Sequence, residues 1–254
     1  MVHAPDTIGI GIAGDPDKVV SSVEKSGLGS RMVCYGHPGI LSGLTTTAAL
    51  RETAEPEREL VRDLYSGSLG AAVRGTLPSN STLTALKAVS GVEHLERAAL
   101  LETADGRKFF LAPVGVDEGW TTGEKVALVE KLREMAGRFG LPPAVAVLSG
   151  GRLGDAGRHT RVDESMAQAE LVARLTGARH FEILIEDAVK ECGVIIAPDG
   201  ISGNLIFRTL IFLGSGHGHG APVLNIDRIF VDTSRASPDY MNAILLADSL
   251  RKDL

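Results

Sequence analysis

Cysteine, aromatic residues and blocks of basic residues are all scarce in this 254-residue chain. Its two cysteines, Cys34 and Cys192, lie far apart, which excludes a disulfide framework or metal-ligand spacing and is typical of a reducing cytoplasm. Lysine and arginine number 26 against 32 acidic residues and form no cluster, so the charge pattern of a nucleic-acid-binding protein is missing. We therefore expect no nucleic-acid partner.

Long apolar runs are also missing. The most apolar stretch, Leu205–Leu213, is about half the length that a membrane span needs and contains Arg208. The N-terminus, MVHAPDTIGIGIAG, has no export signal. These absences predict a cytoplasmic protein without a membrane partner.

What the chain does contain is 44% apolar residues and 30 glycines, a composition that favours strand-to-helix turns around a large core or two modest ones. Short β-branched runs recur with helix-like stretches between them, and AVAVL and VIIA are apolar throughout, as in strands covered on both faces. The predicted fold is α/β with mostly parallel sheets flanked by helices. The runs are Thr7–Ile12, Arg31–Tyr35, Ala71–Val73, Ala144–Leu148, Val194–Ala197 and Ile229–Val231.

One hairpin interrupts this pattern, because Ala98–Thr103 and Lys108–Pro113 flank an Asp-Gly turn, which makes the sheet mixed. A capping box at Thr121–Glu124 predicts a helix that ends before Gly140. A second helix is expected over Val162–Thr176.

Four segments that follow predicted strands carry candidate site residues. The first is Ser149-Gly150-Gly151-Arg152, followed by Arg158, where free backbone N–H groups and arginines at a strand's carboxyl end favour an anion site. A glycine-rich turn with surface arginines is the alternative.

The second segment runs from Pro198 to Asn204 and opens a helix over Leu205–Leu213. It offers Asp199, Ser202, Gly203 and Asn204 as ligand contacts, although Asp199 or Ser202 is equally suited to capping the helix.

The third segment, Asp232-Thr233-Ser234-Arg235, leads to Asp239. Arg235 is suited to clamping an oxyanion with Ser234 donating beside it. Ser237-Pro238-Asp239 also fits a helix start. The fourth segment contributes Arg74 and Gly75, or is simply a polar loop.

His217 and His219 alternate with glycines and have no third ligand nearby in sequence, so we expect no metal site.

Taken in their order along the chain, the four segments resemble the phosphate acetyl/butyryl transferases, from about Leu69 to the C-terminus. Leu148-Ser149 is similar to that superfamily's Leu-Ser-Phe-Ser turn, Asp199 to Asn204 to its Asp-x-x-x-Gly-Asn, and Asp232 to Arg235 to its Asp-Leu-Ser-Arg. The whole chain resembles the family called methanogenesis marker protein four (MtxX), a methyltransferase subunit of methanogenic archaea, through LSGGRLGDAGRH, APDGISGNLIFRTL and NIDRIFVDTSR.

The resemblance implies a two-lobed fold like that of the phosphotransacetylases and isocitrate dehydrogenase, with a cleft between the lobes, and a homodimer. Residues 1–123 with 221–254 would form one lobe and residues 124–220 a second lobe inserted in it. In the phosphotransacetylases the Ser-Arg pair binds the acyl-phosphate and an aspartate serves as base for the coenzyme A thiol. Ser234 and Arg235 inherit the binding role, and Asp239, one residue out of register, is the candidate base.

The function expected from these residues is a transferase that binds a phosphate-bearing or acyl-phosphate molecule in the inter-lobe cleft. Coenzyme A or a methanogenic coenzyme would be a co-substrate, with no covalently bound cofactor. A methyltransferase subunit and a ligand-binding regulator without turnover are the alternatives.

Overall fold

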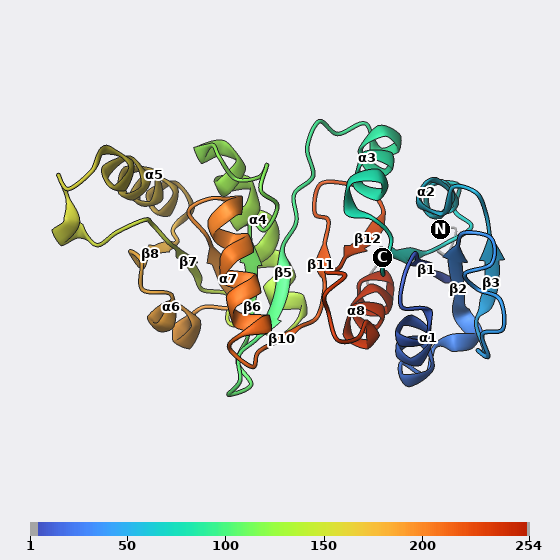
Figure 1. Cartoon of the computed structure of the whole chain (residues 1–254). Coiled ribbons are helices and arrows are strands. Elements are labelled where there is room, and N and C mark those ends of the chain that lie inside the picture. The colour runs from blue at the N-terminus through green and yellow to red at the C-terminus, as the bar shows by residue number, and fades with distance from the viewer. Residues whose placement is uncertain (1–4, 253–254) are drawn as a thin grey trace. The chain divides into compact units, whose positions relative to one another are not determined.

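The computed structural model describes residues 5–252, which form two compact α/β units. The first unit contains residues 5–93 and 219–252, and the second contains residues 94–218 (Figure 1). Each unit has its own six-stranded, mostly parallel mixed sheet flanked by helices, which confirms the predicted fold class. None of the helices in residues 5–252 has the length and apolar character that a membrane span requires.

The division of the chain differs from the expected one in the position of its first boundary. The second unit begins at His94, whereas the family resemblance implies a change of lobe after residue 123. The reason is strand pairing: the hairpin of β5 (Ala99–Glu102) and β6 (Lys108–Ala112) pairs with β9 (Val194–Ile196), so it belongs to the second sheet. The later boundary falls at His219, close to the expected residue 221.

The sheet of the first unit has the order β11-β12-β4-β1-β2-β3, and only the pair of β11 and β12 is antiparallel. The inner strand β1 contains Gly9 and Gly11. A Cβ added to Gly9 would lie 2.6 Å from the Leu60 side chain, and one added to Gly11 would lie 2.1 Å from the Leu77 side chain. These glycines therefore admit the leucines that pack on the strand. The strands are β1 (Ile8–Ile12), β2 (Met32–Gly36), β3 (Ala49–Glu52), β4 (Ala71–Val73), β11 (Ala221–Pro222) and β12 (Ile229–Asp232).

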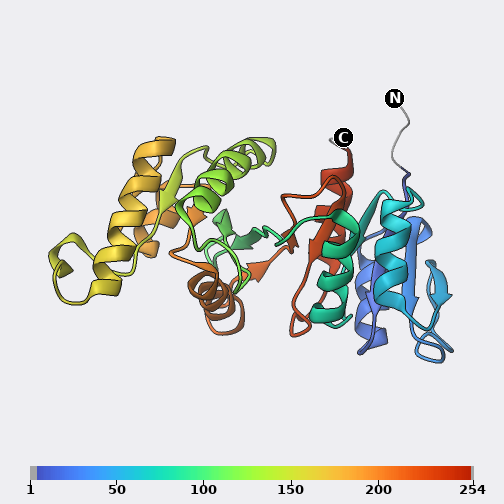
Figure 2. The same ribbon diagram turned by 90° about the horizontal axis from the view of Figure 1, so that it is seen from above.

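Helices cover both faces of this sheet. In Figure 1, α2 (Pro56–Tyr65) and α3 (Ser79–Ser90) lie above the strands, and α1 (Pro16–Lys25) and α8 (Met241–Lys252) lie below them. Figure 2 shows α2 and α3 side by side. The strands they cover, such as β1 and β4, are fully buried, as their continuous apolarity predicts.

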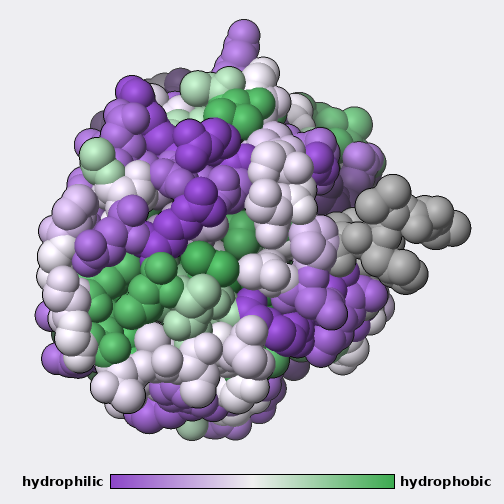
Figure 3. Space-filling model, turned by 90° about the vertical axis from the view of Figure 1, so that its right-hand side faces the viewer, coloured by the Kyte–Doolittle hydropathy of each residue, from purple (hydrophilic) through white to green (hydrophobic). Residues whose placement is uncertain are grey.

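The edge of the first sheet is formed by β3, whose four residues are all exposed. Leu50 on this strand is 41% exposed beside the charged Arg51 and Glu52. Figure 3 looks onto this end of the unit and shows an apolar area bordered by hydrophilic surface. Charged residues on an exposed edge strand discourage pairing with other chains.

The second sheet has the order β10-β5-β6-β9-β7-β8. The helices α4 (Thr122–Arg138) and α5 (Thr160–Thr176) lie against each other, as Figure 2 shows. The capping box predicted for α4 is present, with the Thr121 hydroxyl accepting from the Glu124 N–H and the Glu124 carboxylate accepting from the Thr121 N–H. The remaining elements are β7 (Val145–Val147), β8 (Arg179–His180), β10 (His217–Gly218), α6 (Ile185–Glu191), α7 (Gly200–Phe212) and two short 3-10 turns, Gly29–Arg31 and Leu153–Asp155.

Candidate functional site

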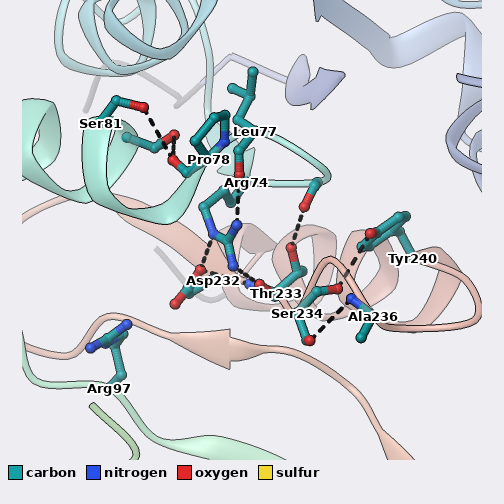
Figure 4. A network of polar contacts seen from close by, with 12 residues as sticks. Arg74, Leu77, Pro78, Ser81, Arg97, Asp232, Thr233, Ser234, Ala236 and Tyr240 are labelled. Atoms are coloured by element: carbon teal, nitrogen blue, oxygen red, sulfur yellow. Dashed lines mark hydrogen bonds and ion pairs between the residues drawn. The ribbon is translucent and has the colours of Figure 1, made fainter. Parts of the chain in front are cut away.

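The carboxyl ends of β1, β4 and β12 meet at one edge of the first sheet, because these neighbouring strands are parallel. The loops that follow them begin at Ala13, Arg74 and Thr233. Ligands of open α/β sheets bind at this edge. The sequence segments containing Arg74 and Ser234 are thereby brought together, as Figure 4 shows.

Arg74 joins two of these loops from a buried position (Figure 4). Its Nε donates to the Asp232 carboxylate, its Nη2 donates to the Thr233 carbonyl, and its Nη1 donates to the Leu77 carbonyl at 2.7 Å. Asp232 is also buried, so Arg74 and Asp232 form a buried pair of opposite charges. Arg74 thus fixes the turn after β12 to the turn after β4, and direct contact of its guanidinium with a ligand stays a prediction.

Gly75 serves the same junction. Its φ of 60° lies in the left-handed region, and an added Cβ would lie 2.1 Å from the Gly11 carbonyl oxygen. The Thr233 hydroxyl donates to the Gly75 carbonyl at 2.9 Å, and the Thr76 hydroxyl accepts from the Ala13 N–H at 2.9 Å. The loops after β1, β4 and β12 are therefore held as one assembly.

The turn that contains Ser234 and Arg235 is fixed through its carbonyl groups. The Tyr240 hydroxyl lies 3.3 Å from the carbonyl oxygen of Ser234 and 3.4 Å from the carbonyl oxygen of Arg235. Lys18 on α1 donates to the carbonyls of Arg235 and Ser237, each at 3.2 Å. The sequence pattern did not single out Lys18 or Tyr240, because these contacts join positions more than 200 residues apart or lie within an irregular loop.

The two predicted anion-binding side chains of this turn differ in their partners. The Ser234 hydroxyl accepts from the Ala236 N–H at 3.2 Å, which leaves its own proton for another acceptor. The Arg235 side chain is exposed and makes no hydrogen bond or ion pair with residues 5–252. A fixed backbone therefore presents an uncompensated guanidinium at the carboxyl edge of the sheet.

Asp239 is exposed, and its Oδ1 accepts from the Met241 N–H at 3.1 Å at the start of α8. The helix begins at Met241, so Ser237 and Pro238 precede it and do not form the predicted N-cap and first turn. In a helix that started there, the Ser237 carbonyl would accept from the Met241 N–H. In the structure it accepts from Lys18 instead, and the Met241 N–H donates to Asp239. The role of Asp239 as a base stays a prediction.

The glycine-rich turn of the second unit differs from the open anion site expected from its sequence. The N–H groups of Ser149, Gly150 and Arg152 donate to Glu182 O, Ser165 Oγ and Asp155 Oδ2, at 2.7, 2.9 and 2.9 Å. These backbone donors are therefore already used within the unit. Arg152 and Arg158 are exposed, and Arg158 pairs with Asp155 at 2.8 Å.

The segment after β9 is shaped by helix capping and close packing. Asp199 accepts from the Ser202 N–H at 2.7 Å, which makes α7 begin at Gly200, earlier than the predicted Leu205. A Cβ on Gly203 would lie 1.9 Å from the Pro113 oxygen, and Asn204 donates to the Val114 carbonyl at 3.0 Å. The capping alternative for Asp199 is confirmed.

Lys125 is a buried cation that the sequence pattern did not reveal. Its ammonium group donates to Gln168 Oε1 at 2.5 Å and to the Pro198 carbonyl. Burial lowers its pKa to about 8, although Asp199 and Glu124 act in the opposite direction. It ties α4 and α5 to the turn that opens α7.

No cluster of three or more His, Cys, Asp and Glu side chains suited to a metal ion occurs in residues 5–252.

Comparison with curated proteins finds close relatives over almost the whole chain. A protein of Methanosarcina barkeri named "Putative methyltransferase mtx subunit X" is 45% identical over 250 residues, which cover 96% of this chain and 92% of that protein. No protein-family model matches the sequence.

Among solved structures, a branched-chain phosphotransacylase from Enterococcus faecalis V583 matches 96% of this chain and 99% of its own length, with a TM-score of 0.75 and 15% identity. A phosphotransacetylase from Streptococcus pyogenes matches 100% of this chain and 96% of its own length, with a TM-score of 0.71 and 14% identity. At these identities the likeness shows a shared fold.

Proposed function

Because the chain belongs to the family of proteins named "Putative methyltransferase mtx subunit X", we propose that it is a transferase of methanogen metabolism that binds a phosphate-bearing or acyl-phosphate molecule. The observation that carries this proposal is the exposed guanidinium of Arg235, which has no hydrogen bond or ion pair with residues 5–252, on a turn held by Arg74, Lys18 and Tyr240. The phosphotransacetylase fold supports it.

In the proposed reaction, Arg235 donates two hydrogen bonds to phosphoryl oxygens in a bidentate contact, and the Ser234 hydroxyl donates a hydrogen bond to the same group. The thiol of coenzyme A or of a methanogenic coenzyme attacks the acyl carbon. A carbon–sulfur bond forms, the bond from carbon to the phosphate oxygen breaks, and the thiol proton passes to Asp239. Phosphate leaves with its charge balanced by Arg235, so catalysis rests on positioning and charge stabilisation.

In the second unit, further proposed contacts come from the exposed side chains of Arg152 and Arg158, because the N–H groups of Ser149, Gly150 and Arg152 already donate within the unit. These contacts, and assembly as a homodimer in the cytoplasm, remain parts of the proposal. The name of the relatives contains the word subunit, which favours assembly with other chains.

A methyltransferase subunit acting on a methanogenic coenzyme is the second candidate, favoured by the name of the relatives. A regulator that binds the same ligand without turnover is the third. Ligand preference separates the first two, and turnover separates both from the regulator.

Thermal unfolding with acetyl phosphate, phosphate, coenzyme A, coenzyme M and tetrahydromethanopterin tests the proposal. A ligand at one hundred times its Kd adds about 2.7 kcal/mol to the free energy of unfolding. We expect acyl phosphates or coenzyme A to stabilise the chain and Arg235→Ala to abolish the acyl-phosphate effect. Arg138→Ala, which removes an exposed arginine paired with Glu134 on α4, should keep it. Stabilisation by the methanogenic coenzymes alone would favour the methyltransferase subunit instead.

Asp239→Asn tests turnover separately from binding. An asparagine oxygen can still accept from the Met241 N–H, so we expect unchanged folding and ligand affinity. Loss of a base lowers the rate by about a hundredfold or more. Full turnover in this variant would exclude Asp239 as the base, and binding without turnover in the wild-type chain would support the regulator.

A further inference from the structure

A serine, a histidine and a glutamate form a connected series in the second unit. Ser149 follows β7 and is 1% exposed, and its Oγ lies 2.9 Å from Nε2 of His180 on β8. The other imidazole nitrogen, Nδ1, lies 3.4 Å from Oε2 of Glu170 on α5. The Ser149 Oγ is also 2.9 Å from the Gly151 carbonyl oxygen. A hydroxyl, a base and a carboxylate are thus aligned at the glycine-rich turn.

The number of protons in this series decides which contacts are satisfied. The Ser149 hydroxyl has one proton, and the Gly151 carbonyl can only accept. The Glu170 carboxylate, 3.4 Å from Nδ1, favours the tautomer that has its proton there. If His180 is neutral, Nε2 then has a lone pair, and Ser149 faces two acceptors with one proton. If His180 is protonated, Nε2 donates to Ser149 and Ser149 donates to Gly151, so every contact is made.

The charged groups near His180 lie on α5, on β8 and on α6. On α5, Glu170 also accepts from Arg174 at 3.0 Å. Hydrogen bonds from Arg174 and then from His180 lower the pKa of Glu170 against the effect of desolvation, so this group is a carboxylate. On β8 itself, Arg179 is paired with Glu191 of α6 at 2.5 Å. The group that directly faces the imidazole is therefore anionic.

The glycine-rich turn is supported by the loop that follows His180. Glu182 has a φ of 56°, which is strained for a residue with a side chain. Its carbonyl accepts from the Ser149 N–H at 2.7 Å, and its Oε1 lies 3.3 Å from the Leu153 nitrogen. The loop after His180 therefore contacts the backbone on both sides of the glycine-rich turn, at Ser149 and at Leu153.

We propose that His180, oriented by Glu170, is a positioning residue whose proton sets the direction of the Ser149 hydrogen bond and thereby the conformation of the turn Ser149–Arg152. With the proton present, the turn is closed by the bond from Ser149 to Gly151. When the proton leaves, Ser149 turns its hydroxyl proton to Nε2 and the Gly151 carbonyl loses its partner. The expectation that this change also alters anion affinity rests on the proposed function, which assigns an anion contact to the turn Ser149–Arg152.

Nuclear magnetic resonance on the full chain tests this device without any ligand. Amide signals of Gly150 and Gly151 and ring nitrogens of His180 are followed from about pH 5 to about pH 9, which brackets the ordinary titration of histidine. We expect one shared midpoint for the ring and both amides. His180→Gln places a permanent amide donor near the position of Nε2, so its Gly150 and Gly151 signals should stay constant. His37→Gln, at an exposed histidine of the first unit, is the matched control and should behave as wild type.

A Gly151 signal that stays constant while His180 titrates would overturn the proposal, as would an unchanged amide titration in His180→Gln. The Kd for sulfate, whose charge is constant over this range, provides the functional readout. It should rise about two- to tenfold towards alkaline pH, the effect of one net hydrogen bond, and the rise should vanish in His180→Gln. Sulfate affinity with the same pH dependence in both chains would overturn the coupling to the ligand. Lack of sulfate binding would count against the anion site, and the amide titration would still test the device.

Discussion

Two arginines on neighbouring loops of the first unit show how surroundings decide the role of a residue. Arg74 is buried, with its charge opposed by Asp232 and its donors directed at backbone carbonyls. Arg235 is exposed and has no partner among the described residues. Arg74 therefore stabilises the loops, and the Arg235 guanidinium is available to a ligand.

Replacing Arg74 with methionine should destabilise the chain strongly. The change removes the cation that opposes the buried Asp232 carboxylate, together with the hydrogen bonds of Arg74 to the Thr233 and Leu77 carbonyls, which costs about 3–5 kcal/mol in the free energy of unfolding. Urea unfolding measures this loss. Arg138→Met, which removes an exposed pair, should cost less than about 1 kcal/mol, and equal effects in the two variants would contradict the structural role of Arg74.

A second prediction at the residue scale concerns Asp248, whose contribution to stability should depend on pH. Burial raises its pKa, but hydrogen bonds from Lys252, Arg31 and Arg251 outweigh burial and lower the pKa to about 2. The folded pKa is thus below the unfolded value, and the stabilisation is present at neutral pH and is lost as pH falls from about 4 to about 2.

Asp248→Asn should therefore lower the free energy of unfolding at neutral pH by an amount on the order of 1–2 kcal/mol. The difference from wild type should shrink as the pH approaches 2.5, roughly the region of the folded pKa. Urea midpoints at several pH values measure it, with Glu186→Gln, an exposed position on α6, as control. A difference that is independent of pH would show that packing and not charge is responsible.

At the scale of elements, α7 is placed by two small residues that touch the loop after β6. A Cβ on Gly200 would lie 1.6 Å from the Gly115 oxygen, and a Cβ on Gly203 would lie 1.9 Å from the Pro113 oxygen. Both obstacles are backbone atoms, which cannot move aside as a flexible side chain can. The helix therefore tolerates no larger residue on this face.

Gly203→Ala should destabilise the chain even though alanine favours helices by about 1 kcal/mol over glycine. The matched change Gly137→Ala in α4 meets no atom within 4 Å and should stabilise by up to about 1 kcal/mol. Thermal unfolding of both variants compares the two effects. Stabilisation in both would mean that α7 does not approach the loop as closely as the structure shows.

Comparison of these elements with the sequence pattern shows where prediction succeeds. The strands with long apolar runs and the helix with a capping box are found where the pattern places them. The pattern does not reveal β8 and β10. Each of these strands has only two residues, which is too short to show a periodic pattern, and each is defined by its pairing with a neighbouring strand. The pattern places the start of α7 at Leu205, because Gly200 and Gly203 are poor helix formers, whereas the cap at Asp199 starts the helix at Gly200.

The candidate site follows the same division. The turn with Ser234 and Arg235 was predicted from local sequence, whereas its supports Lys18 and Tyr240 were not. The contact of Lys18 with Arg235 spans 217 positions, and nothing in the local pattern of α1 indicates it. The fold brings together what sequence spacing separates.

At the scale of the whole molecule, the two units differ in continuity. The second unit is one unbroken segment, residues 94–218, and contains every strand of its sheet. The first unit needs residues 219–252, because β12 pairs with β4 and α8 packs on both strands.

Residues 94–218 should therefore fold when produced alone, with circular dichroism of an α/β protein and one cooperative thermal transition. Residues 1–93 alone should not, since β4 would have an open edge in place of β12. A folded 1–93 fragment would show that β12 and α8 are dispensable to the first unit.

The central claim is that Arg235 binds an oxyanion from a turn that other residues hold in place. Isothermal titration calorimetry with acetyl phosphate on wild type, Arg235→Ala, Arg235→Lys and Arg138→Ala measures it most directly. We predict binding in wild type and Arg138→Ala, weaker binding in Arg235→Lys because lysine cannot form a bidentate contact, and a loss of at least about tenfold in Arg235→Ala, which retains the wild-type thermal midpoint without ligand. Equal affinity in wild type and Arg235→Ala would contradict the claim.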